Sequence, residues 1–213
     1  MVDKRPQSGF AHFTLSYVLR YAGLQREAAK ECQTAMRLDP GNYQFRSCAS
    51  VFFSQGRYDE GRAFLKLDAG SEWSNNVEVQ ALLREGRITE ALEQLRKLPH
   101  STFFHSSVLA ACYTTPRPPD ADQLLSQAEK EVVTFRDPEP RYSFAVVYNH
   151  CMGNAFTTRL LKSAIDGGFC AYENLQFDPL LKEFRKSPEY PPILAQAKQC
   201  QDHFMAQRDQ PQH

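Results

Sequence analysis

The sequence lacks a surplus of charge of either sign. Lys plus Arg and Asp plus Glu each number 25 among 213 residues, so the formal net charge at pH 7 is zero. Proteins that bind nucleic acid or a membrane surface usually carry a basic excess that neutralises phosphates. The charge balance therefore argues against both classes of partner.

A long apolar run is also missing. No segment approaches the ~20 apolar residues that a helix needs to span a bilayer. Residues 1–6 have the sequence MVDKRP and contain no apolar signal-peptide core. We therefore expect no membrane insertion and a cytoplasmic location.

The cysteines lack the short spacing that metal ligation requires. Structural zinc sites draw on clustered ligands such as C-x-x-C pairs, and the sequence contains none of these pairs. We expect no metal and no cofactor, and we expect the cysteines to be small buried thiols in a reducing compartment. The six positions are Cys32, Cys48, Cys112, Cys151, Cys170 and Cys200.

A recurring pattern is the strongest positive signal in the chain. A helix-ending glycine, followed by a second helix with small residues at fixed offsets, occurs at Gly23, Gly56 and Gly86. The glycines are 33 and then 30 residues apart, close to the 34-residue tetratricopeptide period. Self-similarity at this period predicts pairs of helices that bury their apolar faces against neighbouring pairs.

Three units resemble the tetratricopeptide consensus at specific positions. In the first unit, Leu19 and Cys32 replace the usual aromatic residues. We expect the small residues Ala28, Ala35 and Ala91 to be buried at close contacts between helices. The first unit matches at Leu15, Ser16, Leu19, Gly23, Ala28, Cys32, Ala35 and Pro40. The second matches at Cys48, Ala49, Phe52, Gly56, Tyr58, Gly61 and Leu65, and the third at Leu82, Gly86, Ala91, Leu95 and Pro99.

The resemblance implies an all-α fold: αα-hairpins stacked in a right-handed, tetratricopeptide-like superhelix with a C-terminal helical cap. The fourth unit is interrupted by the Pro cluster at 114–119, which cannot be helical, and Asp120 is expected to cap the next helix. Gly153 is expected to separate the two helices of the fifth. The expected single domain comprises units at 9–41, 42–71, 72–101, 102–137 and 138–168, followed by C-terminal helices at 169–213.

The C-terminal stretch resembles the tetratricopeptide tail of bacterial proteins that carry a eukaryotic-like Ser/Thr kinase or winged-helix regulator domain. The shared features are the Gly-Phe turn at 168–169 and the Asp-Pro-Leu helix start at 178–180, whereas the Ser-Pro-Glu-Tyr turn at 187–190 departs at its acidic cap. No kinase glycine loop or catalytic loop occurs, so any kinase activity would belong outside this chain. The resemblance implies the interaction module of a larger bacterial signalling protein.

In the tetratricopeptide family, the first helix of each unit lines a concave binding surface. The resemblance thus implies a protein or peptide partner. We expect Tyr17, Arg20, Tyr21, Arg46 and Phe53 to line this surface together and to be partly exposed. Tyr, Trp and Arg are enriched at binding hot spots, and Arg20 and Arg46 favour an acidic or carboxylate-bearing segment. The corresponding positions here are Phe10, Phe13, Tyr17, Arg20 and Tyr21; then Tyr43, Arg46, Ser50, Phe53 and Ser54; then Trp73, Asn76, Gln80, Leu83 and Arg84.

Two other functions stay open from the sequence. Exposed terminal helices would allow self-association. An enzyme would need titratable groups that converge, and His105 and His150 are the pair that could face one groove from the fourth and fifth units. Because histidines are commonly half-buried without any catalytic role, we expect no catalytic residues.

Overall fold

The computed structural model describes residues 2, 5–98 and 106–210, and every regular element within them is helical. The all-α expectation is confirmed for this part of the chain. The α-helices are α1 (Gly9–Tyr21), α2 (Gln25–Leu38), α3 (Ala49–Phe53), α4 (Tyr58–Leu65), α5 (Glu72–Arg84), α6 (Ile88–Lys97), α7 (Ser106–Tyr113), α8 (Ala121–Val132), α9 (Pro138–Asp166), α10 (Tyr172–Phe177) and α11 (Tyr190–Arg208). Short 3₁₀ segments are η2 (Tyr43–Cys48), η3 (Lys66–Asp68), η4 (Pro179–Leu181) and η5 (Phe184–Lys186).

Three helix pairs open the chain, and each pair is joined by a tight turn at a glycine. Gly23, Gly56 and Gly86 have φ values of 77°, 72° and 75°, in the left-handed region that favours glycine. In each turn, the glycine N–H and the next N–H donate to carbonyls three and five residues earlier, which satisfies the helix end. The prediction that these glycines occupy equivalent turns is confirmed.

Small residues allow the paired helices to approach closely. Ala28, Ala35 and Ala91 are fully buried, as predicted. Gly61 has the same role in α4, because a Cβ there would lie 2.3 Å from a ring carbon of Phe53. Larger side chains at these positions would force the helices apart.

Two local features differ from the prediction. The first helix of the second unit is split into η2 and α3; residues three apart eclipse in a 3₁₀ segment, and this places both Phe45 and Cys48 in the core. Asp120 precedes α8, but its backbone has φ −90° and ψ 0° and its side chain caps no N–H group. The expected division of the fifth unit is present, because Gly153 has a non-helical backbone, with φ 76° and ψ 178°, and separates the two helical parts of α9.

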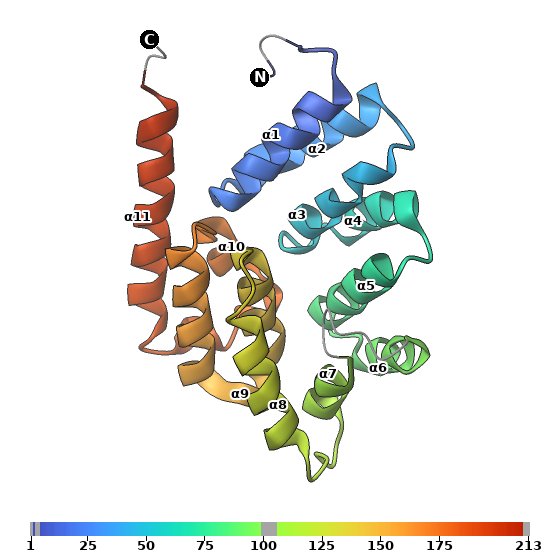
Figure 1. The fold of residues 1–213 in the computed structure, drawn as a ribbon, viewed down its shortest axis with the longest axis vertical. Helices are drawn as coiled ribbons and strands as arrows, with labels where there is room; N and C mark the ends of the chain where they lie inside the picture. Colours follow the sequence, from blue (N-terminus) through green and yellow to red (C-terminus); the bar gives the residue numbers. More distant parts are fainter. Residues whose placement is uncertain (1, 3–4, 99–105, 211–213) are drawn as a thin grey trace.

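The C-terminal part of the chain returns to the first helix pair. Figure 1 shows the chain passing from α1 through α5 and α7, then back through α8, α9 and α10, with α11 beside them. The return is fixed at the turn after α1, where Gln201 Nε2 donates to the Gly23 carbonyl over 2.9 Å and Cys170 N donates to the Tyr21 carbonyl over 2.8 Å. The predicted end cap is instead a segment that closes the array on itself.

All six cysteines are paired in disulfides, so the prediction of buried thiols is wrong. The paired cysteines lie 16, 39 and 30 residues apart in the sequence. A search for short spacings cannot find such pairs. The bonds join Cys32 to Cys48, Cys112 to Cys151, and Cys170 to Cys200.

The apolar core has two parts. One lies within the first helix pairs and the other extends from α5 through α9 to α11. Among the described residues, none of the helices combines the length and apolar character needed to cross a bilayer.

Candidate functional site

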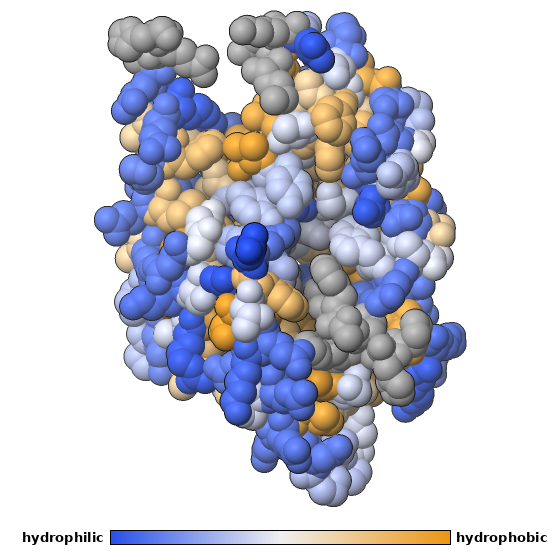
Figure 2. Space-filling model, in the orientation of Figure 1, coloured by the Kyte–Doolittle hydropathy of each residue, from blue (hydrophilic) through white to orange (hydrophobic). Residues whose placement is uncertain are grey.

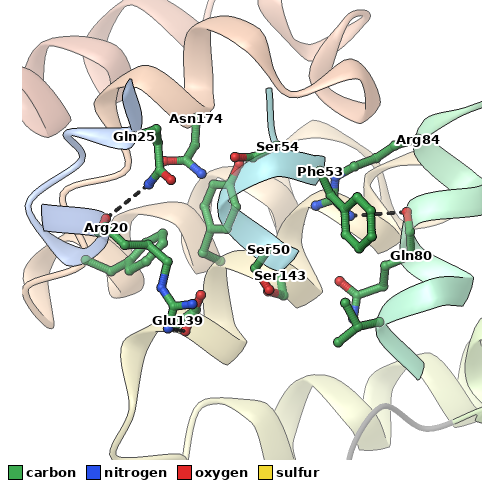
Figure 3. Close-up of a pocket in the computed structure, with 13 residues that line it drawn as sticks. Arg20, Gln25, Ser50, Phe53, Ser54, Gln80, Arg84, Glu139, Ser143 and Asn174 are labelled. Carbon is green, nitrogen blue, oxygen red and sulfur yellow. Dashed lines mark hydrogen bonds and ion pairs between the residues drawn. The ribbon is translucent and has the colours of Figure 1, made fainter. Parts of the chain in front are cut away.

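A polar pocket lies where the first three helix pairs face the returning C-terminal segments. In Figure 3, Arg20 and Glu139 lie on one side and Gln80 and Arg84 on the other, with Ser50 and Ser143 between them. This inner pocket measures about 410 Å³, including space open to solvent. It is lined by Arg20, Gln25, Ser50, Phe53, Ser54, Val77, Gln80, Arg84, Glu139, Tyr142, Ser143, Phe169 and Asn174.

A wider hollow, which we call the mouth, adjoins the inner pocket and measures about 610 Å³, again including open solvent. The two share six lining residues, so they form one continuous depression. The residues that belong to the mouth alone come from α1, η2, α5 and the start of α9. They are Tyr17, Ser47, Trp73, Asp137 and Pro140.

Arg20 is the central cation of this depression. It lies in the last turn of α1, and its Nη1 donates to the Ser47 carbonyl over 2.8 Å while Nη2 donates to Glu139 Oε2 over 2.9 Å. Its guanidinium also lies 4.5 Å from the centre of the Tyr17 ring. The side chain is almost completely buried, so its charge is held in place by α9 rather than offered to solvent.

Two carboxylates, those of Asp137 and Glu139, lie at the hydroxyl of Tyr21. The Tyr21 hydroxyl donates to Asp137 Oδ1 over 2.7 Å and lies 3.5 Å from Glu139 Oε2. Burial raises the pKa of the Glu139 carboxyl, Arg20 lowers it, and the nearby charge of Asp137 raises it again. Burial, followed by the charge of Glu139, raises the pKa of the Tyr21 hydroxyl, so this group stays a neutral donor.

A second ion pair closes the far side of the inner pocket. Arg84, the last residue of α5, donates through Nη2 to Asp178 Oδ2 over 2.9 Å and through Nε over 3.1 Å. Asp178 is completely buried and also accepts from the Tyr142 hydroxyl over 3.2 Å. Burial raises the pKa of Tyr142, and the adjacent Asp178 adds to this rise. The pair connects α5 to the segment that follows α10.

Some of the predicted binding residues form a row of exposed aromatic rings. Phe10, Tyr17 and Tyr43 are 54%, 39% and 58% exposed. Phe13, which lies between Phe10 and Tyr17 in the sequence, is half-buried. Along α1 the ring centres of Phe10 and Phe13 are 6.2 Å apart, and those of Phe13 and Tyr17 are 6.5 Å apart. Figure 2 shows apolar side chains over α1, whereas hydrophilic ones cover the region of α8.

The other predicted binding residues are turned inward. Phe53 is 2% exposed, and Asn76 is buried with its Nδ2 donating to the Glu72 carbonyl over 2.8 Å. Arg20 and Arg84 are buried against carboxylates of the returning segments, whereas partial exposure was expected for Arg20 and Phe53. The helical period places these residues on the concave side, but it does not show that α9 and α10 cover that side.

Arg46 is also paired within the chain. Its Nε lies 3.0 Å from Asp68 Oδ2, and its guanidinium lies 5.4 Å from the Tyr43 ring centre and 5.5 Å from that of Trp73. The arginines that were expected to attract an acidic peptide therefore already have carboxylate partners.

The histidine pair gains no support as a reaction centre. His105 lies outside the described residues. His150 is exposed, and its ring stacks on Tyr113 with the centres 5.3 Å apart. Within residues 5–98 and 106–210, no group of three or more His, Cys, Asp or Glu residues is placed to hold a metal ion.

Several residues that line the depression were not predicted from the sequence. Asp137 caps α9 by accepting from Glu139 N over 2.9 Å, and the acidic Asp-Pro-Glu-Pro run at 137–140 is a recognisable helix start. No motif or spacing in the sequence marks Gln25 or Asn174 as a site residue. Gln25 Oε1, Asn174 Oδ1 and Arg20 Nε are buried and have no hydrogen-bond partner among the described residues.

Comparison of the chain with protein-family models and with curated proteins gives no match.

Proposed function

We propose that the chain is a protein- or peptide-binding module built from helical repeats of the tetratricopeptide type. Its binding surface is the aromatic face, which we define as Phe10, Phe13, Tyr17, Tyr43 and Trp73. The observation that carries the proposal is the exposure of Phe10, Tyr17 and Tyr43, of which Tyr17 lines the mouth. Neighbouring exposed rings have a solubility cost that a partner would remove.

The aromatic face has the properties of a binding hot spot. Phe10, Phe13 and Tyr17 are separated by three and four residues, so they lie on one side of α1. Both Trp73 and Tyr43 contact the Arg46 guanidinium. Rigid aromatic side chains lose little conformational entropy on binding, and this makes them effective anchors.

The cellular setting forms a separate part of the proposal. Resemblance in the C-terminal stretch favours a module of a bacterial signalling protein in the cytoplasm. The three disulfides favour a location outside the reducing cytoplasm, because such bonds form and persist in oxidising surroundings. We give the disulfides more weight, since they involve every cysteine of the chain, and we place the module in an oxidising environment.

A pull-down from the source cell tests the binding surface. The double variant Phe10→Ala, Tyr43→Ala removes the two most exposed rings of the aromatic face. Phe177→Ala, which removes a ring on α10 that is 47% exposed, is the control. We expect the double variant to lose the partner that the wild type and the control retain. Equal recovery by all three proteins would contradict the proposal.

Sedimentation of the purified chain distinguishes a foreign partner from a second copy. A dimer that dissociates in the Phe10→Ala, Tyr43→Ala variant would make the aromatic face a self-association surface. A monomer at all concentrations would leave a different protein as the partner.

A further inference from the structure

The mouth contains more negative than positive charge. Its charged side chains are one cation, Arg20, and two carboxylates, Asp137 and Glu139. Arg20 is committed to Glu139 at 2.9 Å. Asp137 accepts its two hydrogen bonds, from Tyr21 and from Glu139 N, on Oδ1, and the residue is exposed. Its second oxygen, Oδ2, has no cationic partner among the described residues, and the residue lines the mouth.

The inner pocket behind the mouth contains unused acceptors. The side chains of Gln25 and Asn174 are more than nine-tenths buried, yet Gln25 Oε1 and Asn174 Oδ1 accept no hydrogen bond from any described residue. Buried acceptors without donors are costly. A group rich in N–H donors would satisfy them, and an anion would not.

The arginines near the mouth do not favour an acidic ligand over a basic one. Arg20, Arg46 and Arg84 each have a carboxylate partner within the chain. An acidic ligand would have to break one of these pairs and would then leave a carboxylate unpaired. A basic ligand breaks none of them.

We propose that the partner inserts a basic side chain, Lys or Arg, into the mouth, where it meets Asp137. This inference rests on the proposed function of the aromatic face. The rings of Tyr17 and Trp73 line the mouth and contact the aliphatic stem of the incoming side chain, a common use of aromatic residues around cations. Arg20 Nε is a buried donor without an acceptor; a peptide carbonyl would satisfy it, and a free metal cation would not.

Trp73 provides the readout, because it is the only tryptophan of the chain and lines the mouth. The probes are four acetylated, amidated pentapeptides of the form Leu-Gly-Xaa-Gly-Leu, in which Xaa is Arg, Lys, Gln or Glu. Tryptophan fluorescence and calorimetry measure their affinities for the oxidised full chain. We expect the Arg and Lys peptides to bind at least about tenfold more tightly than the Gln peptide, the ratio that one charge-assisted hydrogen bond supplies. The Glu peptide should bind most weakly.

The variant Asp137→Asn removes the charge and keeps the capping oxygen of α9. It should abolish the preference for Arg and Lys over Gln, whereas Glu183→Gln, an exposed change on the distant segment after η4, should leave it intact. Equal binding of the Glu and Arg peptides, a preference that survives Asp137→Asn, or no binding of any peptide would each overturn the inference.

The failure of this inference and that of the proposed function can be separated. Equal affinities for all four peptides, lost together in the Phe10→Ala, Tyr43→Ala variant, would keep the aromatic face as a binding surface and remove the basic side chain. A partner retained by that double variant in the pull-down would instead reject the aromatic face itself.

Discussion

Removing the carboxylate of Asp178 should destabilise the protein strongly, because this group joins α5 to the returning C-terminal segment. The side chain is completely buried and accepts from Arg84, from the Tyr142 hydroxyl and from Leu180 N. Asp178→Ala leaves a buried guanidinium without a counter-ion. Breaking one partner of a buried ion pair typically costs about 3–5 kcal/mol.

Urea unfolding followed by circular dichroism at 222 nm measures this loss, with Trp73 fluorescence as a second probe. With a slope of about 2 kcal/mol per molar urea, the midpoint should fall by about 2 M. The control Glu183→Ala removes an exposed carboxylate that pairs with Lys186 at 2.8 Å, and it should leave the midpoint unchanged. If Asp178→Ala does not fold, Asp178→Asn keeps the shape and gives a smaller loss of the same sign.

The double variant Arg84→Met, Asp178→Leu sharpens the test. Replacing both partners of a buried pair by apolar side chains of similar size is often close to neutral, so this variant should be more stable than Asp178→Ala. A loss of less than about 1 kcal/mol in Asp178→Ala, or no recovery in the double variant, would refute the reasoning, since Arg84 would then not be a buried charge that depends on Asp178.

Three further predictions concern packing, disulfides and pH. Ala28→Leu should overpack the fully buried contact within the first pair and cost about 1–3 kcal/mol; an unchanged melting temperature would contradict the assigned packing. Mass spectrometry of unreduced protein alkylated at lysis should find no alkylated cysteine. The double variant Cys170→Ala, Cys200→Ala, which opens a loop of 30 residues, should cost about 3.5 kcal/mol in urea unfolding. Burial lowers the pKa of His12, but its hydrogen bonds to Glu31 at 2.5 Å and to a backbone carbonyl raise it more, so the folded pKa lies above the usual value. The stabilising contribution of His12 is therefore complete below about pH 6.5 and is lost as the pH rises through the folded pKa; unfolding midpoints between pH 5.5 and 8.5 should fall in the wild type relative to His12→Gln.

The local parts of the fold could be predicted from the sequence. Gly23, Gly56 and Gly86 mark turns whose left-handed backbone depends on the absence of a Cβ. The buried alanines follow from small residues at helical spacing. Both signals arise within one helix pair, where neighbours in sequence are neighbours in space.

The closure of the array could not be predicted in this way. Arg84 and Asp178 are 94 residues apart, and Arg20 and Glu139 are 119 apart. A helical period shows which side of a helix is inward, but it carries no information about which distant segment covers that side. The same reason explains why the disulfide partners were missed and why Phe53, correctly placed on the inner side, is buried instead of exposed.

Hydroxyl-radical footprinting of the aromatic side chains tests the central claim most directly, because it measures the closed inner side and the open aromatic face in one experiment. In the free protein, Phe10, Tyr17 and Tyr43 should be oxidised rapidly, while Phe53 should be protected. Addition of the captured partner should protect Phe10, Tyr17 and Tyr43 and leave Phe177 reactive. Rapid oxidation of Phe53 in the free chain would show an open array, and an aromatic face that stays reactive in the complex would show that the partner binds elsewhere.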